Sequence, residues 1–255
     1  MELWSQEHIQ TLIPATVIMA LLAMLLRHFL GKKSFETRML PLKILAVILL
    51  ALEIGKQALS LSRGYDLYCL PFHFCSLFIS MLPMAAFYRG KWKNAVWEIT
   101  GALCTAVFAL MMIYPCLIYS ADNIRLFFRD YMSFHTVAFH NLVVLALFLI
   151  VALELHQPSG RANNRAIALF MLGFCTVSAS MAHLLKTNFN NFYSCNIPPL
   201  EVLRQAVQDA LGFTPAQLLY VLIVTALDFG FVFGCYALCR AAWKLAEKQR
   251  SRVSV

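Results

Sequence analysis

Seven stretches of mostly apolar residues constrain this sequence more than any other feature. Each is about 20 residues long, the length at which a helix crosses the roughly 30 Å hydrocarbon core of a membrane. Composition agrees, because a 255-residue chain that is 60% hydrophobic and 13% charged has more apolar side chains than one soluble core can bury. We therefore expect a polytopic membrane protein with spans near 11–30, 41–61, 67–87, 95–119, 127–153, 166–187 and 217–239.

The spans are expected to be helices. Inside a bilayer no water satisfies the backbone amides, so only helices and closed barrels can cross, and the alternating apolar and polar pattern of a barrel is absent. The predicted fold class is all-α, with residues 1–255 forming a single domain, a seven-transmembrane-helix bundle. The longest non-spanning segment, 188–216, should contain an interfacial helix with the sequence LEVLRQAVQDALG.

The Lys and Arg residues predict the orientation of the bundle. Fifteen of them, from Arg27 to Arg252, lie in or beside the loops on one predicted side of the membrane, whereas five lie on the other side. The positive-inside rule then places the N-terminus outside and the C-terminus in the cytoplasm. Glu2 and Glu7 precede the first span without any Lys or Arg, so we expect a retained helix rather than a removable signal. Because the net charge of +8 is spread over short loops, we expect no nucleic-acid partner.

Polar residues inside the spans predict where a functional site lies. A charged side chain at a helix centre costs about 2.5 to 3.5 kcal/mol on insertion scales, so it must face protein or trapped water. Eight polar residues lie within the predicted spans. In the predicted topology six of them lie in the outer half of the membrane, and His140 and Asp228 lie near the middle. Their shared depth predicts one polar site open to the outer half. The residues are Glu53, Lys56, His73, Cys75, His135, His140, His183 and Asp228.

Helical geometry suggests which of these side chains can meet. At about 100° per residue, positions two apart project about 200° from each other, so His73 and Cys75 are not expected to face the bundle centre together. His135 and His140 diverge by about 140° on the same reasoning and should have different surroundings. A base for Cys75 is therefore expected from another span.

Five short blocks carry a resemblance to a known family. LPFHFC at 70–75 resembles the LP-aliphatic-H-x-C block of the YwaF family of bacterial integral membrane proteins, which is related to the transmembrane-protein-164 phospholipid acyltransferase. Other blocks follow in the family's order and together cover about 150 residues. Phe192 stands where the family usually has tyrosine, and Thr214 where it has an aromatic residue. The blocks are EITGAL at 98–103 followed by Pro115, FHNLVV at 139–144, NFYSCNIPP at 191–199 and LGFTP at 211–215.

The resemblance implies acyl transfer between phospholipids in a bacterial cytoplasmic membrane. It implies that Cys75 is the nucleophile and His140 the base, with membrane phospholipids as partners and no cofactor or metal. This chemistry is physically reasonable, because a thiol needs an adjacent base before it attacks an acyl ester. Lys56 or Asn191 is expected to donate a hydrogen bond to the oxyanion. Glu53, His73, His135 and Asp228 are expected to bind substrate or support the site.

Simpler interpretations stay open for each residue. Cysteines in membrane helices often only pack, and histidines such as His140 often only bond neighbouring helices. Glu53 and Lys56, three residues apart, share a helix face and can neutralise each other. Asp228 is open to a purely structural role in a polar contact. Cys69 and Cys195, both predicted near the outer face, could form a disulfide.

Other functional classes also stay open. A proton-coupled carrier would need polar groups near the middle of the membrane, but the chain lacks the paired, interrupted halves that usually form such a site. A membrane scaffold would not need the shared depth of the polar residues. A zinc-dependent lipid hydrolase is disfavoured because no HxxxH pair is present.

Overall fold

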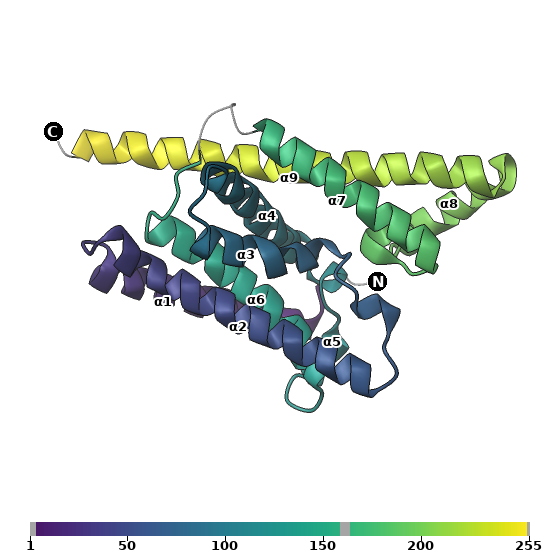
Figure 1. Cartoon of the computed structure of the whole chain (residues 1–255), viewed down its shortest axis with the longest axis horizontal. Coiled ribbons are helices and arrows are strands. Elements are labelled where there is room, and N and C mark those ends of the chain that lie inside the picture. The colour runs from purple at the N-terminus through teal and green to yellow at the C-terminus, as the bar shows by residue number, and fades with distance from the viewer. Residues whose placement is uncertain (1–3, 159–163, 254–255) are drawn as a thin grey trace.

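The computed structural model describes residues 4–158 and 164–253, and within these ranges the chain forms helices joined by loops (Figure 1). Glu2 and Arg161, which entered the predictions of the retained first helix and of the orientation, lie outside the described residues. Six described helices are long and apolar enough to cross a membrane. The all-helical, polytopic membrane fold predicted from the apolar stretches is therefore confirmed. The six are α1 (Gln6–Leu30), α2 (Phe35–Ser62), α4 (Lys93–Ile113), α6 (Tyr131–Ala152), α7 (Asn164–Leu185) and α9 (Phe213–Val253).

Shorter helices connect the long ones. Two of them, α3 and α8, are long enough to pack as separate elements, and the rest are single turns in loops. They are η1 (Leu67–Cys69), η2 (Phe74–Leu77), α3 (Phe78–Phe87), η3 (Pro115–Leu117), α5 (Ala121–Arg125), η5 (Phe189–Asn191) and α8 (Pro198–Leu211).

The stretch 67–87 does not form the continuous spanning helix that its hydrophobicity suggested. Pro71 has no amide proton and disfavours helical backbone in the residue before it, and Leu70 is accordingly extended, with ψ of 146°. His73 is also extended, with ψ of 153°, so the apolar helix begins only at Phe74. At about 1.5 Å per residue, Phe74–Phe87 is shorter than the roughly 30 Å core of a bilayer. A seventh full span and the orientation of the bundle stay predictions.

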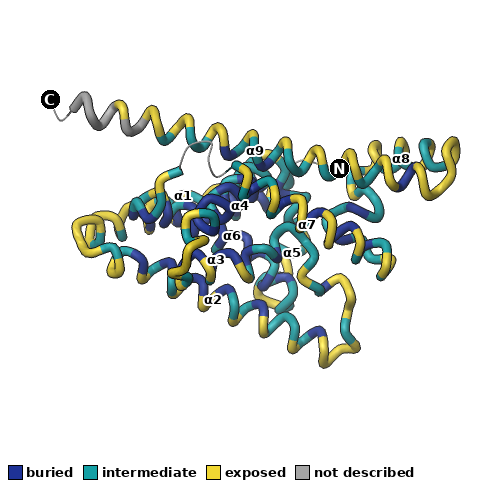
Figure 2. Tube along the Cα trace, turned by 45° about the horizontal axis from the view of Figure 1, so that its top comes forward, coloured by how far each residue is buried: buried dark blue, intermediate teal, exposed yellow. Residues whose placement is uncertain are grey.

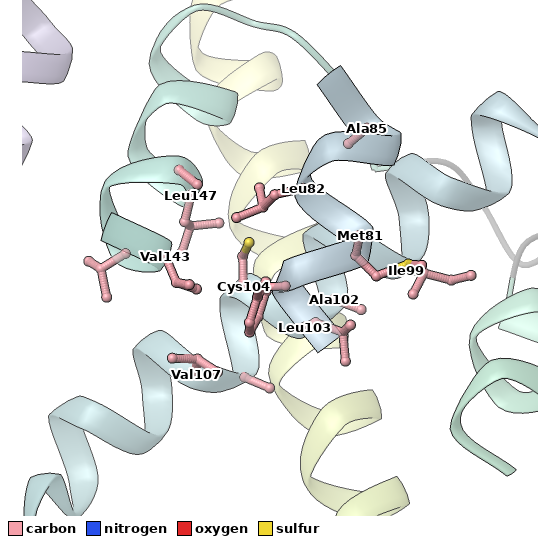
Figure 3. Packing of buried hydrophobic residues seen from close by; sticks show 14 of the residues in the cluster. Met81, Leu82, Ala85, Ile99, Ala102, Leu103, Cys104, Val107, Val143 and Leu147 are labelled. Atoms are coloured by element: carbon pink, nitrogen blue, oxygen red, sulfur yellow. The ribbon is translucent and has the colours of Figure 1, made fainter. Parts of the chain in front are cut away.

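Helix α4 lies at the centre of the bundle. It packs against α3 and α6 on one side and against α7 and α9 on the other, while α6 also packs against α1 and α2. Ala102, Cys104 and Ala106 of α4 are completely buried, and their small side chains allow the neighbouring helices to approach. Figure 3 shows Leu82, Cys104 and other side chains of α3, α4 and α6 gathered in this core.

The outer helices are much more exposed than this core. Buried residues concentrate in α3, α4 and α6, whereas α8 has none among its residues and most of α9 is exposed or half-buried (Figure 2). Gly212 ends α8 with a φ of +80°, a conformation that glycine adopts without strain, and α9 begins at the next residue. The predicted helix in 188–216 is thus present as α8, and its position at a membrane interface stays a prediction.

Candidate functional site

One cavity of about 580 Å³ collects the residues singled out in the sequence. Its wall is formed by α2, the segment around η1 and η2, α4, α6, the loop before α8, and the helices α8 and α9. His183 of α7 is not part of the described lining; its Nδ1 lies 2.8 Å from the Ala179 carbonyl oxygen. The predicted site residues that line the cavity are Glu53, Lys56, His73, Cys75, His135, His140, Asn191 and Asp228.

The cavity has a polar and an apolar part. Charged, histidine and asparagine side chains come from α2, α6 and the loop 188–196, together with His73, Arg204 of α8 and Asp228 of α9. Aliphatic residues such as Leu117, Leu219 and Ile223 come from the η3 turn and from α9. Apolar walls with a few placed polar groups are typical of sites for small molecules and cofactors. A ligand with one polar and one apolar portion would match this lining.

Glu53 is the centre of the polar part. Its Oε1 lies 2.8 Å from Nζ of Lys56 and accepts a hydrogen bond of 2.7 Å from Nε2 of Gln57. Its Oε2 lies 3.2 Å from Nε2 of His135, an ion-pair distance when the imidazole is protonated, although the two atoms are not aligned for a hydrogen bond. The contact expected between Glu53 and Lys56 is therefore present, and a histidine of α6 joins it.

A close approach of α2 and α6 positions this cluster. The Tyr131 hydroxyl donates a hydrogen bond of 2.9 Å to the Leu52 carbonyl oxygen, and a Cβ atom at Gly55 would lie only 2.1 Å from that hydroxyl. Glycine at this position lets α6 approach the α2 backbone. Because His135 follows Tyr131 by four residues, it lies on the same face of α6 and reaches Glu53.

Gln57 connects the cluster to the segment that carries Cys75. Its Nε2 also donates a hydrogen bond of 2.8 Å to the Cys69 carbonyl oxygen, and its Oε1 accepts one of 2.7 Å from the Tyr65 hydroxyl. These contacts hold the chain after α2 against the helix. The result is that residues 68–76 lie along the cavity beside Glu53 and Lys56.

His73 and Cys75 both line the cavity, so the prediction that they would not face the bundle centre together does not hold. That prediction assumed a regular α-helix, but His73 has extended backbone and the 3-10 turn begins after it. The angle of about 100° per residue therefore does not apply between the two positions. The His73 ring is held by an Nε2 contact of 3.1 Å to the Tyr68 carbonyl oxygen and lies 5.3 Å from the Phe189 ring.

The two histidines of α6 both line the cavity but have different partners. His140 places Nδ1 2.7 Å from the Thr136 carbonyl oxygen, and its ring centre lies 6.3 Å from that of Tyr119. His135 instead faces the Glu53 carboxylate. The different surroundings expected for the pair are present, although both belong to one cavity. Both rings share the cavity with Cys75, and the pairing of Cys75 with His140 as its base stays a prediction.

An asparagine-rich loop forms another part of the wall. Asn190 donates a hydrogen bond of 2.7 Å from Nδ2 to Oδ2 of Asp228, the polar contact expected for that carboxylate. Asn190 and Asn191 have positive φ values of 48° and 59°, a region that asparagine tolerates better than most residues. The Asn191 carbonyl oxygen accepts a hydrogen bond of 2.6 Å from the Tyr220 hydroxyl of α9, which fixes the loop against the cavity.

Arg204 and Glu201 of α8 were missed as parts of the site. Arg204 lines the cavity and binds both carboxylate oxygens of Glu201, at 2.8 and 2.6 Å, and this pairing lowers the pKa of Glu201 to about 2. A further hydrogen bond of 3.2 Å to Gln217 connects α8 to α9. The spacing of three residues was the available signal for the ion pair, but nothing in the sequence placed it at the cavity.

Cys69 and Cys195 also line the cavity, and both are free cysteines, so the disulfide considered from the sequence is not formed.

The described part of the chain contains no group of three His, Cys, Asp or Glu side chains arranged to hold a metal ion. The polar groups that line the cavity include thiols, imidazoles, carboxylates, amides, an ammonium and a guanidinium.

Fold and cavity together define a polytopic helical membrane protein with an internal site of mixed polarity. The chain belongs to the TMEM164 family, whose family model matches residues 3–236. The sequence resemblance described above included the transmembrane-protein-164 acyltransferase as a relative, and the matched family carries that name. Membership of the YwaF family stays a prediction. Comparisons with curated proteins and with solved structures found no match. Which membrane holds the protein also stays a prediction.

Proposed function

We propose that this protein is a phospholipid acyltransferase in which Cys75 is the nucleophile and His140 its base. The observation that carries the proposal is that these two residues line one cavity of mixed polarity, in a chain that belongs to the TMEM164 family. A phospholipid has the matching combination of a polar headgroup, ester bonds and apolar chains. The cavity brings a thiol, a base and hydrogen-bond donors to the region where an ester would lie.

The size of the cavity limits which part of the lipid enters. The volume of about 580 Å³ falls within the roughly 300 to 1,000 Å³ that is typical of sites for small molecules. The headgroup and the ester region fit this volume, and most of both acyl chains would extend into the bilayer. The aliphatic residues of α9 are suited to the first part of a chain.

The reaction starts with removal of the thiol proton. His140 takes the proton from Cys75, and the thiolate attacks the ester carbonyl carbon of a donor phospholipid. The bond from that carbon to the alcohol oxygen breaks, and the donor leaves as a lysophospholipid. Lys56 and Asn191 are the donors that we assign to the developing oxyanion. A thioester on Cys75 then passes its acyl group to the hydroxyl of a lysophospholipid. The surrounding apolar residues limit access of water, which would otherwise hydrolyse the thioester.

Purified protein tests this proposal directly. Given a diacyl phospholipid with one labelled chain and an unlabelled lysophospholipid, it should move the label without acyl-CoA. Cys75→Ala should abolish transfer, and Cys75→Ser should retain at most a trace because a hydroxyl is a poorer nucleophile at this position. Cys104→Ala, which alters a buried core cysteine outside the cavity, is the matched control and should stay active.

Two results would contradict the acyltransferase proposal. One is an absence of label transfer by wild-type protein together with unchanged acyl distributions in cells that lack the protein. The other is transfer by Cys75→Ala at the wild-type rate. In the first case a carrier for a polar or amphipathic molecule becomes the better account of the cavity.

A further inference from the structure

The two cavity histidines of α6 are equipped for different proton transfers. His140 has one ring nitrogen at a backbone carbonyl oxygen, Nδ1 at 2.7 Å from Thr136. His135 has Nε2 at 3.2 Å from a carboxylate oxygen of Glu53. A backbone carbonyl orients a ring, whereas a carboxylate also stabilises the ring when it is protonated. The surroundings of His140 therefore suit a ring that accepts a proton, whereas those of His135 suit a ring that starts protonated and donates its proton.

The hydrogen bonds around Glu53 leave one oxygen for His135. Lys56 and Gln57 both contact Oε1, and His135 faces Oε2. The Glu53 and His135 side chains are each less than a tenth exposed, so the attraction between them is weakly screened. Lys56 contacts the same carboxylate, and its positive charge reduces the net attraction between Glu53 and a protonated His135.

We propose that Glu53 and His135 form a second proton-transfer pair that acts on the alcohol oxygen of the lipid, while His140 acts on the Cys75 thiol. This inference rests on the proposed acyl transfer. It assigns one reacting atom to each histidine: the sulfur of Cys75 to His140 and the alcohol oxygen of the lipid to His135. Glu53 is a positioning residue, because it acts on the substrate through His135.

The first half of the reaction then balances without an added acid or base. In the proposed starting state Cys75 is a thiol, His140 is neutral, and His135 carries the proton that it will donate, beside the Glu53 carboxylate. His140 takes the thiol proton, the sulfur forms a bond to the carbonyl carbon, and the bond from that carbon to the alcohol oxygen breaks. His135 gives its proton to the departing oxygen, which leaves as the hydroxyl of a lysophospholipid. An S-acyl cysteine, a protonated His140 and a neutral His135 remain.

The second half reverses these roles. The hydroxyl of the acceptor lipid gives its proton to His135 as its oxygen bonds to the thioester carbon. The bond between carbon and sulfur breaks, and Cys75 recovers its proton from His140. Both histidines return to their resting states, so the same pair serves the leaving alcohol and the attacking alcohol.

The experiment compares a poor leaving group with a good one. Acylation of Cys75 is timed by intact-protein mass spectrometry without an acceptor, using a diacyl phospholipid or p-nitrophenyl octanoate. The nitrophenolate leaves without being protonated, whereas the lipid alkoxide needs a proton. His135→Gln should slow acylation by the phospholipid by roughly 100-fold to 10,000-fold and leave acylation by the aryl ester close to wild type. His140→Gln should slow acylation by both donors.

Matched variants separate this role from a structural one. Glutamine at 135 keeps a polar N–H donor facing the Glu53 carboxylate but has no proton that it can transfer, so a polar contact between α2 and α6 is retained without proton transfer. His183→Gln, a histidine of α7 outside the cavity lining, should match wild type with both donors. Glu53→Gln provides a second variant if His135→Gln does not fold, and it should show the same dependence on the leaving group, with a smaller loss.

The outcomes are distinct. Equal slowing of both donors by His135→Gln or Glu53→Gln would overturn the assignment and leave only a structural contact between α2 and α6. Unchanged acylation by the phospholipid would overturn it as well. If wild-type Cys75 is acylated by neither donor, the proposed function itself fails and this inference fails with it.

Discussion

Gly55→Ala tests the close approach of α2 and α6 that positions Glu53 and His135. The added Cβ would lie 2.1 Å from the Tyr131 hydroxyl oxygen and 2.8 Å from the ring carbon that bears it. Both distances are far below van der Waals contact, so the tyrosine must move and lose its hydrogen bond to the Leu52 carbonyl oxygen. The contact that fixes α6 against α2 beside the cluster is then lost.

The expected magnitude combines three contributions. Overpacking costs about 1 to 3 kcal/mol, loss of the hydrogen bond about 0.5 to 1.5 kcal/mol, and alanine returns about 1 kcal/mol of helix propensity. Together they predict a net destabilisation of about 0.5 to 3.5 kcal/mol. Acyl transfer should fall as well, because His135 follows Tyr131 by one helical turn.

The assay is unfolding of the detergent-solubilised protein by heat or denaturant, with Gly101→Ala as the matched control. A Cβ at Gly101 in α4 meets nothing within 4 Å, so that variant should be neutral or slightly more stable than wild type. Adding Tyr131→Phe to Gly55→Ala should recover part of the loss, since the nearest clashing atom is removed. Equal stability of Gly55→Ala and Gly101→Ala would refute the reasoning.

Two further predictions concern orientation and pH. A phosphatase fused after Val255 in a bacterial host should be inactive, because the distribution of Lys and Arg predicts a cytoplasmic C-terminus; high activity would reverse the orientation and the outer-half location of the cavity. The pairing with Arg204 depresses the pKa of Glu201 from 4.5 to about 2, so the stabilisation that it provides is fully present above about pH 4.5 and is lost as the pH falls toward 2. The difference in melting temperature between wild type and Glu201→Gln should therefore stay constant from pH 8 to 5 and shrink below 4.5; a difference that already shrinks between pH 8 and 6 would contradict this pairing.

Hydrophobic length predicted most of the fold because it does not depend on local detail. A run of about 20 apolar residues predicts a membrane helix whichever apolar side chains it contains. Six such helices are present among the described residues. The run 67–87 was misleading because hydrophobicity averages over Pro71, whose effect is on the backbone. A continuous helix was therefore predicted where the chain is extended around His73.

The cavity was only partly predictable for the same reason. Polar residues within spans must avoid lipid, and from this requirement we predicted that Glu53, His135, His140 and Asp228 share one site. All four line the same cavity. Which partner each one meets depends on how helices cross, as at Gly55, and on loop backbone, as at Asn190 with its positive φ. Neither is visible in hydropathy or spacing. Arg204 was missed because α8 outside the spans gave no reason to expect it beside the cavity.

The central claim is that Cys75 carries the acyl group. Its most direct test is peptide mass spectrometry of the purified protein after incubation with a diacyl phospholipid and no acceptor. The account predicts an acyl thioester on the peptide that contains Cys75, removed by neutral hydroxylamine and chased into phospholipid when a lysophospholipid is added. An unmodified Cys75, or an acyl group that stays on the peptide after the acceptor is supplied, would contradict it.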